Sequence, residues 1–309
     1  MSEVSSLGER SGGIGTSQSV RKVVIPIAGL GTRFLPLSKS VAKELWPVVD
    51  LPVIQYIVEE VRLSGIREII FVISLEKKPI LDYFKESPKI EKILKERKKT
   101  QLLEELKKLS DISKQVTFSY VFQRRPLGDG HAVFQAAKQV GPEPCGLLFG
   151  DDIVVSVMPC LAQLLKIFKT CQRPVVAIKR IPKEKSPSYG MVGVEKIANR
   201  LYKIKKIVEK PTVETAPSDL AIVGKYILTP EVFEYLARAK PGTRGEIVIA
   251  ETFQEMINDG KVIYGYEFEG DWLECGNKLG WLKSNLYLSL KHPQYGPELK
   301  RYLKEMKEG

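Results

Sequence analysis

One predicted strand and the loop behind it constrain the fold of this chain more than any other segment. Residues 23–27 (VVIPI) are apolar and mostly β-branched, which predicts a buried β-strand. The loop that follows contains Gly29 and Gly31, and glycines let backbone N–H groups approach a bulky anion closely. Two cations come next, Arg33 and Lys43. A strand, a glycine turn and two cations together predict a loop that binds a polyphosphate.

Spacing excludes two common phosphate-binding loops. The Walker motif G-x-x-x-x-G-K-[ST] does not occur in the sequence. The dinucleotide motif G-x-G-x-x-G would require a glycine at position 34, which is Phe34. A G-x-G pair alone would be weak support, because most such pairs only make turns. The longer string G-x-G-T-R-x-x-P, followed by K-E-L-x-P, is much more specific.

The order of predicted elements indicates the fold class. Strands alternate with helices at the spacing of βαβ units, which predicts an α/β protein with a doubly wound, Rossmann-like mixed sheet and helices on both faces. We expect strands at 23–27, 68–73, 116–122, 146–149 and 174–178, and helices at 52–65, 132–139 and 161–168. Ligands of such sheets bind at the carboxyl ends of the strands, where the motifs of this chain fall.

Composition shifts suggest how the chain is divided. Residues 1–20 are rich in Ser and Gly and have no apolar stretch, so we expect a disordered leader rather than a signal peptide. Residues 21–290 would form one domain with two halves, 21–150 and 151–290. The first half contains a charged helical insert at 77–114, and a charged helix is expected at 291–309.

Composition also bears on partners and location. The net charge of +11 raises the possibility of nucleic-acid binding, but the basic residues alternate with acidic ones instead of forming one block. We therefore expect neither a nucleic-acid nor a membrane partner, since no apolar run is long enough for a membrane span. The four cysteines have no metal-ligand spacing, which indicates reduced thiols and a cytoplasmic protein.

Two polar positions follow predicted strands, and each has two interpretations. Asp151 comes directly after the strand at 146–149, where a carboxylate would suit Mg²⁺ but is also common as a turn or helix cap. Gln123 follows the strand at 116–122, beside Gly128. A glutamine amide offers a donor and an acceptor, which suits the imide edge of uracil or thymine, although an exposed loop glutamine is the commoner case.

A third constellation is the string V-E-K-P with Glu209 and Lys210, preceded in the chain by Tyr189-Gly190. A carboxylate can bind sugar hydroxyls and a neighbouring lysine can neutralise a phosphate. A surface Glu-Lys pair at the end of a strand is the other interpretation.

Together these strings resemble the bacterial UTP–glucose-1-phosphate uridylyltransferases, or UDP-glucose pyrophosphorylases, a family of sugar nucleotidyltransferases. The similarity runs from about residue 23 to residue 290 and includes IPIAGLGTRFLP, QLLEEL, GHAV, SPSYGMV, VEKPTVETAPSDLAIVGKYIL and CGNKLG in the family's order. The resemblance implies transfer of UMP from UTP to glucose 1-phosphate, with Mg²⁺ as cofactor. It also implies a homo-oligomer, either a dimer or a tetramer.

The resemblance further makes 21–150 the nucleotide-binding half and 151–290 the sugar-phosphate-binding half, and it implies roles for individual residues. The catalytic residues would be Arg33, Lys43 and Lys210. The nucleotide would be bound by Ala28, Gly29, Gly31, Thr32, Arg33, Gln123 and Gly128. The sugar phosphate would be bound by Gly190, Glu209, Lys210 and Glu246, and the metal by Asp151 and Glu274.

Three positions depart from the family pattern. Glu274 stands where the family usually has the aspartate of D-C-G-N, Glu251 ends a string that is usually E-I-Q-L-T-D, and Ala42 replaces a proline. The sequence therefore leaves alternatives open: a nucleotidyltransferase that uses dTTP or another sugar 1-phosphate, or a catalytically degraded relative that serves as a regulatory or scaffold subunit.

Overall fold

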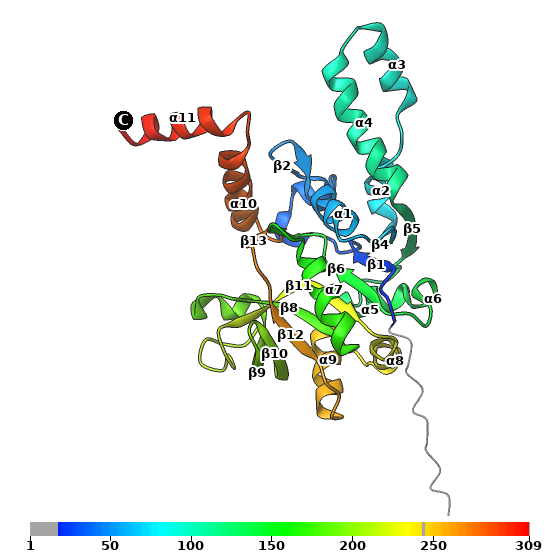
Figure 1. Ribbon diagram of the computed structural model, residues 1–309, viewed down its shortest axis with the longest axis vertical. Helices are drawn as coiled ribbons and strands as arrows, with labels where there is room; N and C mark the ends of the chain where they lie inside the picture. Colours follow the sequence, from blue (N-terminus) through cyan, green and yellow to red (C-terminus); the bar gives the residue numbers. More distant parts are fainter. Residues whose placement is uncertain (1–17, 243–244, 309) are drawn as a thin grey trace, which may run out of the picture.

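The computed structural model describes residues 18–242 and 245–308, and its centre is one nine-stranded mixed sheet (Figure 1). The strands lie in the order β5 (Thr117–Phe122), β4 (Glu68–Ile73), β1 (Lys22–Pro26), β6 (Cys145–Leu148), β11 (Leu220–Leu228), β8 (Val175–Arg180), β12 (Tyr264–Glu267), β10 (Leu201–Glu209) and β9 (Gly190–Ala198). Strands β5, β4, β1 and β6 are parallel, whereas β11 runs antiparallel to both β6 and β8. The predicted fold class is confirmed.

Helices cover both faces of the sheet. Strand β1 requires this, because its apolar side chains point alternately to the two faces and are buried on both. Successive strand residues point to opposite faces, so Ile25 belongs to the core cluster that contains Ile57, and Val24 belongs to the cluster that contains Phe253 on the other face. The first face is covered by α1 (Val53–Leu63) and α7 (Cys160–Cys171). The second is covered by α5 (Asp129–Gln135), α8 (Pro230–Arg238) and α9 (Ile249–Asn258). Burial of each such side chain contributes about 1.5–3 kcal/mol to folding.

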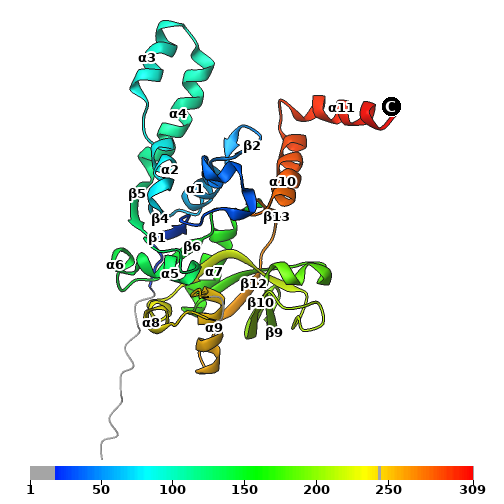
Figure 2. The same ribbon diagram turned by 180° about the vertical axis from the view of Figure 1, so that it is seen from behind.

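The predicted helical insert consists of α2 (Pro79–Tyr83), α3 (Pro88–Glu96) and α4 (Thr100–Gln115). Figure 1 and the view from behind in Figure 2 show α3 and α4 extending away from the body. The expected helix at 132–139 is corrected: α5 starts earlier, at Asp129, and α6 (Ala137–Val140) is a separate turn. The pattern did not predict this interruption because alanine at 136 and 137 favours a continuous helix.

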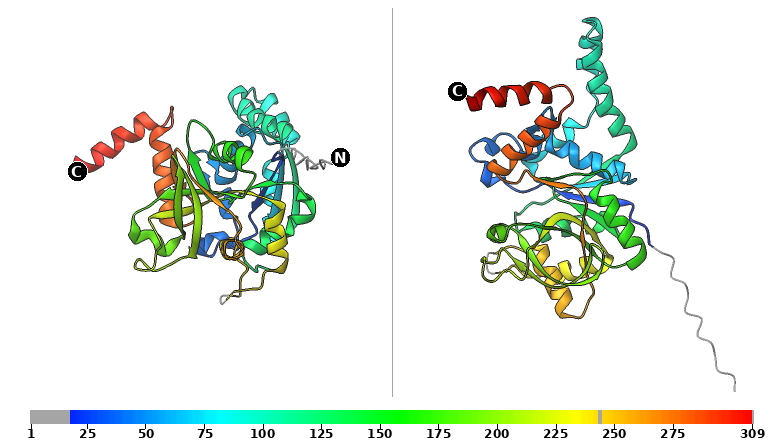
Figure 3. Two further views of the ribbon diagram at one scale, coloured as in Figure 1. Left: turned by 60° about the horizontal axis from the view of Figure 1, so that its bottom comes forward. Right: turned by 60° about the vertical axis from the view of Figure 1, so that its left-hand side comes forward.

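The C-terminal part forms two helices. Helix α10 (Lys278–Lys291) was not predicted, and the expected charged helix is α11 (Gly296–Glu308), which projects from the body in both views of Figure 3. Two short antiparallel pairs lie outside the large sheet: β2 (Pro47–Val48) with β3 (Leu51–Pro52), and β7 (Asp152–Val155) with β13 (Asp271–Glu274).

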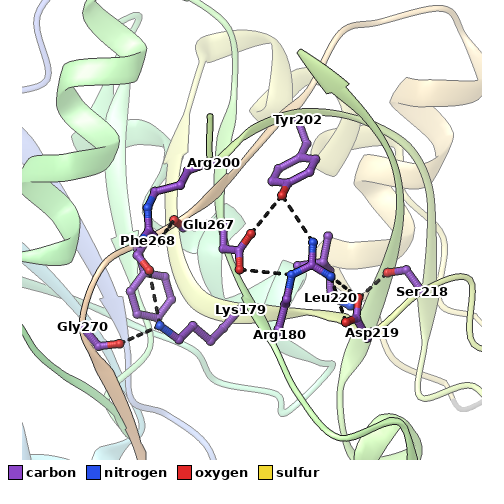
Figure 4. Close-up of polar contacts among 10 residues, drawn as sticks. All are labelled: Lys179, Arg180, Arg200, Tyr202, Ser218, Asp219, Leu220, Glu267, Phe268 and Gly270. Atoms are coloured by element: carbon purple, nitrogen blue, oxygen red, sulfur yellow. Dashed lines mark hydrogen bonds and ion pairs between the residues drawn. The ribbon is translucent and has the colours of Figure 1, made fainter. Parts of the chain in front are cut away.

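A polar network joins β8, β12 and β10, on the side of the sheet away from β5 (Figure 4). Arg180 at the end of β8 donates to both carboxylate oxygens of Asp219 (2.7 and 2.8 Å) and forms an ion pair with Glu267 on β12 (3.3 Å). The hydroxyl of Tyr202 on β10 also donates to Glu267 (2.9 Å). Both hydrogen bonds to Asp219 come from Nη1 of Arg180, and the network links the end of β8 to β12 and β10.

The expected leader falls outside the described residues, except for its last three positions. The sheet runs continuously through the two expected halves, and their separate roles stay an interpretation. None of the helices in the described ranges is long and apolar enough to cross a bilayer.

Candidate active site

A pocket of about 590 Å³ opens where β1, β5 and β6 end. Residues that the sequence analysis assigned to four separate roles line it together: Ala28, Gly29, Gly31, Thr32, Arg33, Lys43, Gln123, Gly128, Asp151, Gly190, Glu209, Lys210, Glu246 and Glu274. The carboxyl ends of neighbouring parallel strands meet at one edge of a sheet, which explains how distant motifs converge. The structure brings all fourteen residues to one pocket, whereas their individual roles stay predictions.

The loop behind β1 forms the first wall. Gly31 has φ 66°, in the left-handed region that favours glycine, and its carbonyl accepts a hydrogen bond from the Ser38 hydroxyl (2.8 Å). A Cβ atom on Gly31 would lie 3.3 Å from the Cβ of Ser38, so a larger residue would crowd the loop. The 3-10 turn Thr32–Phe34 follows, and Phe34 is buried while Arg33 is exposed at the pocket.

Two opposite charges meet between the loop and the end of β6. The Nζ atom of Lys43 contacts Oδ2 of Asp151. Burial acts to lower the pKa of Lys43, but Asp151 and Glu44 outweigh it, and the pKa is raised. Burial likewise opposes ionisation of Asp151, yet Lys43 and Arg33 outweigh it and lower its pKa. Both groups are therefore charged at neutral pH.

The β7–β13 ribbon brings a second carboxylate to the same wall. Glu274 on β13 pairs with Asp152 on β7. The residue after Glu274, Cys275, donates its backbone N–H to the carbonyl of Asp151 (2.8 Å). The two oxygens of Glu274 accept hydrogen bonds from the Tyr189 hydroxyl (2.7 Å) and the Asn277 amide (2.8 Å). The glutamate that departs from the family pattern is thus held in a fixed orientation.

Asp152 belongs to this wall as well. It accepts from the indole N–H of Trp272 (2.7 Å) and the backbone of Gly224 (3.2 Å). Burial, followed by the neighbouring charge of Asp151, raises the pKa of Asp152 to about 7. The sequence could not predict these two hydrogen-bond partners of Asp152, because they lie on β13 and β11, far from it in the chain.

Gln123 and Gly128 form the wall next to β5. The side-chain amide of Gln123 donates to the carbonyl of Gly128 (2.9 Å), and Gln123 is only 8% exposed. Gly128 has φ 101°, and a Cβ there would lie 2.4 Å from the carbonyl oxygen of Ile247. Only glycine fits this close approach.

Segment 246–249 closes this side of the pocket. Ile247 exchanges backbone hydrogen bonds with Leu127 (2.8 Å) and Gly130 (2.9 Å), which holds Glu246 at the pocket. Asp129 accepts from the backbone N–H of Ile249 (2.9 Å) and thereby caps the N-terminus of α9 from another segment. Asp129 lines the pocket but was not predicted as a site residue, because its only signal in the sequence is an acid next to the GHAV string.

The sugar-side candidates lie where two antiparallel strands meet. Gly190 starts β9 and is paired with Glu209 at the end of β10. A Cβ on Gly190 would lie 3.1 Å from the carboxylate of Glu209, so glycine leaves space for that side chain. Lys210 has φ 47°, and its Nζ forms an ion pair with Glu209 (3.0 Å). The pocket therefore contains cations from both parts of the sheet.

Comparisons with known proteins agree with this geometry. The profile of the family described as nucleotidyl transferase matches residues 22–288. The UTP–glucose-1-phosphate uridylyltransferase of Staphylococcus haemolyticus (strain JCSC1435) is 40% identical over 289 residues, 94% of this chain and 99% of that protein. The enzyme of the same name from Bacillus subtilis (strain 168) is 40% identical over 282 residues, 91% of this chain and 95% of the relative.

Solved structures show the same similarity. A UDP-glucose pyrophosphorylase complexed with UDP-glucose superposes with a TM-score of 0.82 at 35% identity, covering 88% of this chain and all of that chain. A UTP-bound UGPase from Acinetobacter baumannii superposes with a TM-score of 0.84 at 34% identity, covering 93% and 99% of the two chains. This chain therefore belongs to the nucleotidyl transferase family, within its group of UTP–glucose-1-phosphate uridylyltransferases.

Proposed function

We propose that the pocket at the ends of β1, β5 and β6 is the active site of a uridylyltransferase. The enzyme transfers UMP from UTP to glucose 1-phosphate and releases pyrophosphate, as the names of its relatives and their complexes with UTP and UDP-glucose support. The observation that carries the assignment of the site is the convergence of Arg33, Lys43 and Lys210 with Gln123 in one pocket. The three cations would neutralise the phosphates of a nucleoside triphosphate and a sugar phosphate, and the side-chain amide of Gln123 would bind the imide edge of the base.

The reaction needs no covalent protein intermediate. A phosphate oxygen of glucose 1-phosphate forms a bond to the α-phosphorus of UTP, and the bond to the bridging oxygen breaks, so pyrophosphate leaves with the electron pair. Residues 28–33 and Lys43 would bind the triphosphate, and Gly190, Glu209, Lys210 and Glu246 would bind the sugar phosphate. Catalysis then consists mainly of positioning two anions and neutralising their charge.

The residues present fit a magnesium ion. Mg²⁺ prefers carboxylate oxygens and keeps phosphate and water ligands. One oxygen of Asp151 contacts Lys43, and the other has no protein partner within the described ranges. Each oxygen of Glu274 accepts one hydrogen bond and keeps a lone pair. We assign Asp151 and Glu274 to the metal, which would supply charge neutralisation at the α-phosphate when bound.

The experiment that tests this function measures pyrophosphate release from purified protein with Mg²⁺ and glucose 1-phosphate, using UTP and dTTP in parallel. We expect turnover with a preference for UTP. Equal or better turnover with dTTP would contradict UTP as the preferred nucleotide. No turnover by folded protein that still binds UTP would contradict glucose 1-phosphate as the acceptor substrate.

We also propose that the enzyme is a homo-oligomer, as the resemblance implies. Helices α10 and α11 expose large apolar side chains that a second copy would cover: Leu279, Leu282, Leu286, Tyr302 and Met306. Light scattering during size-exclusion chromatography should give a mass of two or four chains, and a monomer at micromolar concentration would contradict this.

A further inference from the structure

The side-chain amide of Gln123 is held by two acceptors. Its Nε2 atom lies 2.9 Å from the carbonyl oxygen of Gly128 and 3.0 Å from Nδ1 of His131. A backbone carbonyl can only accept, so the atom facing Gly128 must be the NH₂ group. This contact settles which way the amide is turned, because the reverse orientation would place two acceptors together.

The contact with His131 then determines the protonation state of the imidazole ring. Since the NH₂ group of Gln123 faces Nδ1, that ring nitrogen must accept, and the imidazole must be neutral with its hydrogen on Nε2. Nε2 lies 3.2 Å from the amide nitrogen of Gln135, so with the hydrogen on Nε2 the Gln135 amide must be turned to present its oxygen to the ring. Burial lowers the pKa of His131, which favours the neutral ring.

Both amide hydrogens of Gln123 are therefore used by the protein. Its Oε1 atom has no hydrogen-bond partner within residues 18–242 and 245–308, and Gln123 lines the pocket. A ligand base at this position meets an acceptor rather than a donor. Uracil presents a donor, N3–H, whereas the N3 atom of cytosine is an acceptor and would be repelled.

We propose that His131 is a positioning residue for base selection: by accepting the second amide hydrogen of Gln123, it keeps Oε1 turned toward the N3–H of uracil and so excludes cytidine nucleotides. The proposal rests on the proposed function, which places the base at Gln123. His131 itself is not among the residues that line the pocket, so it acts through Gln123 and not on the nucleotide. Without this acceptor, the amide could turn and present its NH₂ group, which cytosine would accept.

The test compares kcat/KM for UTP and CTP, with Mg²⁺ and glucose 1-phosphate, in the full chain and two variants. His131→Leu keeps the approximate size but removes the acceptor. His131→Asn is the matched control, because its side-chain oxygen occupies nearly the position of Nδ1 and can accept the same hydrogen. We expect the UTP/CTP ratio to fall roughly 10- to 100-fold in His131→Leu, mainly through KM. In His131→Asn the ratio should stay within about threefold of the wild-type value.

The outcomes separate this proposal from the function on which it rests. An unchanged UTP/CTP ratio in His131→Leu, in protein that turns over UTP, would overturn the role of His131. A wild-type enzyme without preference for UTP over CTP would overturn the placement of the base at Gln123, and the role of His131 with it. His131→Gln provides a second variant if His131→Leu does not fold. Glutamine suits a helix but carries no acceptor at the Nδ1 position, so it should also lower the ratio.

Discussion

Lys43 and Asp151, which are 108 residues apart in the sequence, meet as an ion pair between the loop behind β1 and the end of β6. Both charges persist because each partner outweighs the effect of burial on the other's pKa. The pair fixes a cation beside the position proposed for the triphosphate and a carboxylate beside the position proposed for the metal. Charge at this site is therefore arranged before either ligand arrives, which is the condition for electrostatic preorganisation.

Replacement of Lys43 by Met should lower kcat/KM for UTP by about two orders of magnitude, because a positioned cation stabilises charge that develops at the phosphates. Steady-state pyrophosphate release measures the effect. Lys39→Met is the matched control, since Lys39 lies in the same segment but is exposed and does not line the pocket. Equal losses in the two variants would contradict a specific role for Lys43.

Lys210→Met should raise the KM for glucose 1-phosphate by roughly 10- to 100-fold, with a smaller change for UTP, because the variant loses a charge-assisted contact to the sugar phosphate. Methionine preserves the length of the side chain. Lys206→Met is the control, because Lys206 is exposed on β10, the strand that Lys210 directly follows. A larger rise in the KM for UTP than in the KM for glucose 1-phosphate would show that Lys210 binds the nucleotide and not the sugar phosphate.

Chelation should abolish pyrophosphate release, and added Mg²⁺ should restore it. In Asp151→Asn, the Mg²⁺ concentration for half-maximal activity should rise at least about tenfold, because a neutral amide is a weaker ligand than a carboxylate. Asp219→Asn serves as the control, since Asp219 lies in the polar network with Arg180, outside the pocket. Activity that survives complete chelation would rule out the proposed metal.

Asp129→Asn should change the pH dependence of stability. Burial, aided by the charge of Glu209, raises the pKa of Asp129 from 3.8 to about 6, so the folded state binds this proton more tightly than the unfolded state. This contribution makes the free energy of unfolding fall as the pH rises from about 4 to about 6, by up to about 3 kcal/mol. The Asn oxygen can still accept from Ile249, so the variant should avoid that loss.

Urea denaturation of wild type and Asp129→Asn between pH 4.5 and pH 7.5 measures this contribution as the difference between the two curves. The variant should gain stability relative to wild type as the pH rises, and the gain should level off above pH 6. A difference that does not vary with pH would show that Asp129 does not titrate in this range.

Lys225→Met should destabilise the fold by about 3–5 kcal/mol, because it leaves Glu60 buried without a counter-charge. The two side chains are 0% and 7% exposed, and their charged groups lie 2.7 Å apart. Glu60 also accepts from the backbone N–H of Leu161 at the start of α7 (2.9 Å). The double variant Glu60→Gln/Lys225→Met should recover much of the loss in thermal unfolding, and additive losses would contradict the pairing.

The first half of the sheet could be predicted from sequence because its signals are local. Strands such as β4 are continuous apolar runs, and glycines such as Gly65 mark the ends of helices. Helix α10 escaped prediction because its apolar residues lie on two faces: Leu279, Leu282 and Leu286 form an exposed stripe, whereas Trp281 and Leu288 pack against the core. No helical periodicity toward the core distinguishes such a segment.

The members of the candidate site could be predicted in large part, but their contacts could not. Strand-end motifs placed Gln123 and Asp151 at one edge of the sheet without any knowledge of distances. The capping of α9 by Asp129 and the orientation of Glu274 by Tyr189 depend on pairings between segments about 85 to 120 residues apart. Such pairings follow from the tertiary fold and leave no periodic signal in the sequence.

The place of β6 in the sheet has a consequence for synthesis of the protein on the ribosome. β6 lies between β1, which precedes it in the chain, and β11, which is made much later and whose nine residues are all buried. A nascent chain that has just completed β6 therefore exposes an apolar strand edge, a surface prone to aggregation. We expect the growing chain to need protection by chaperones until β11 emerges, and the pocket is complete only later still, because Glu246 and Glu274 follow β11 in the chain.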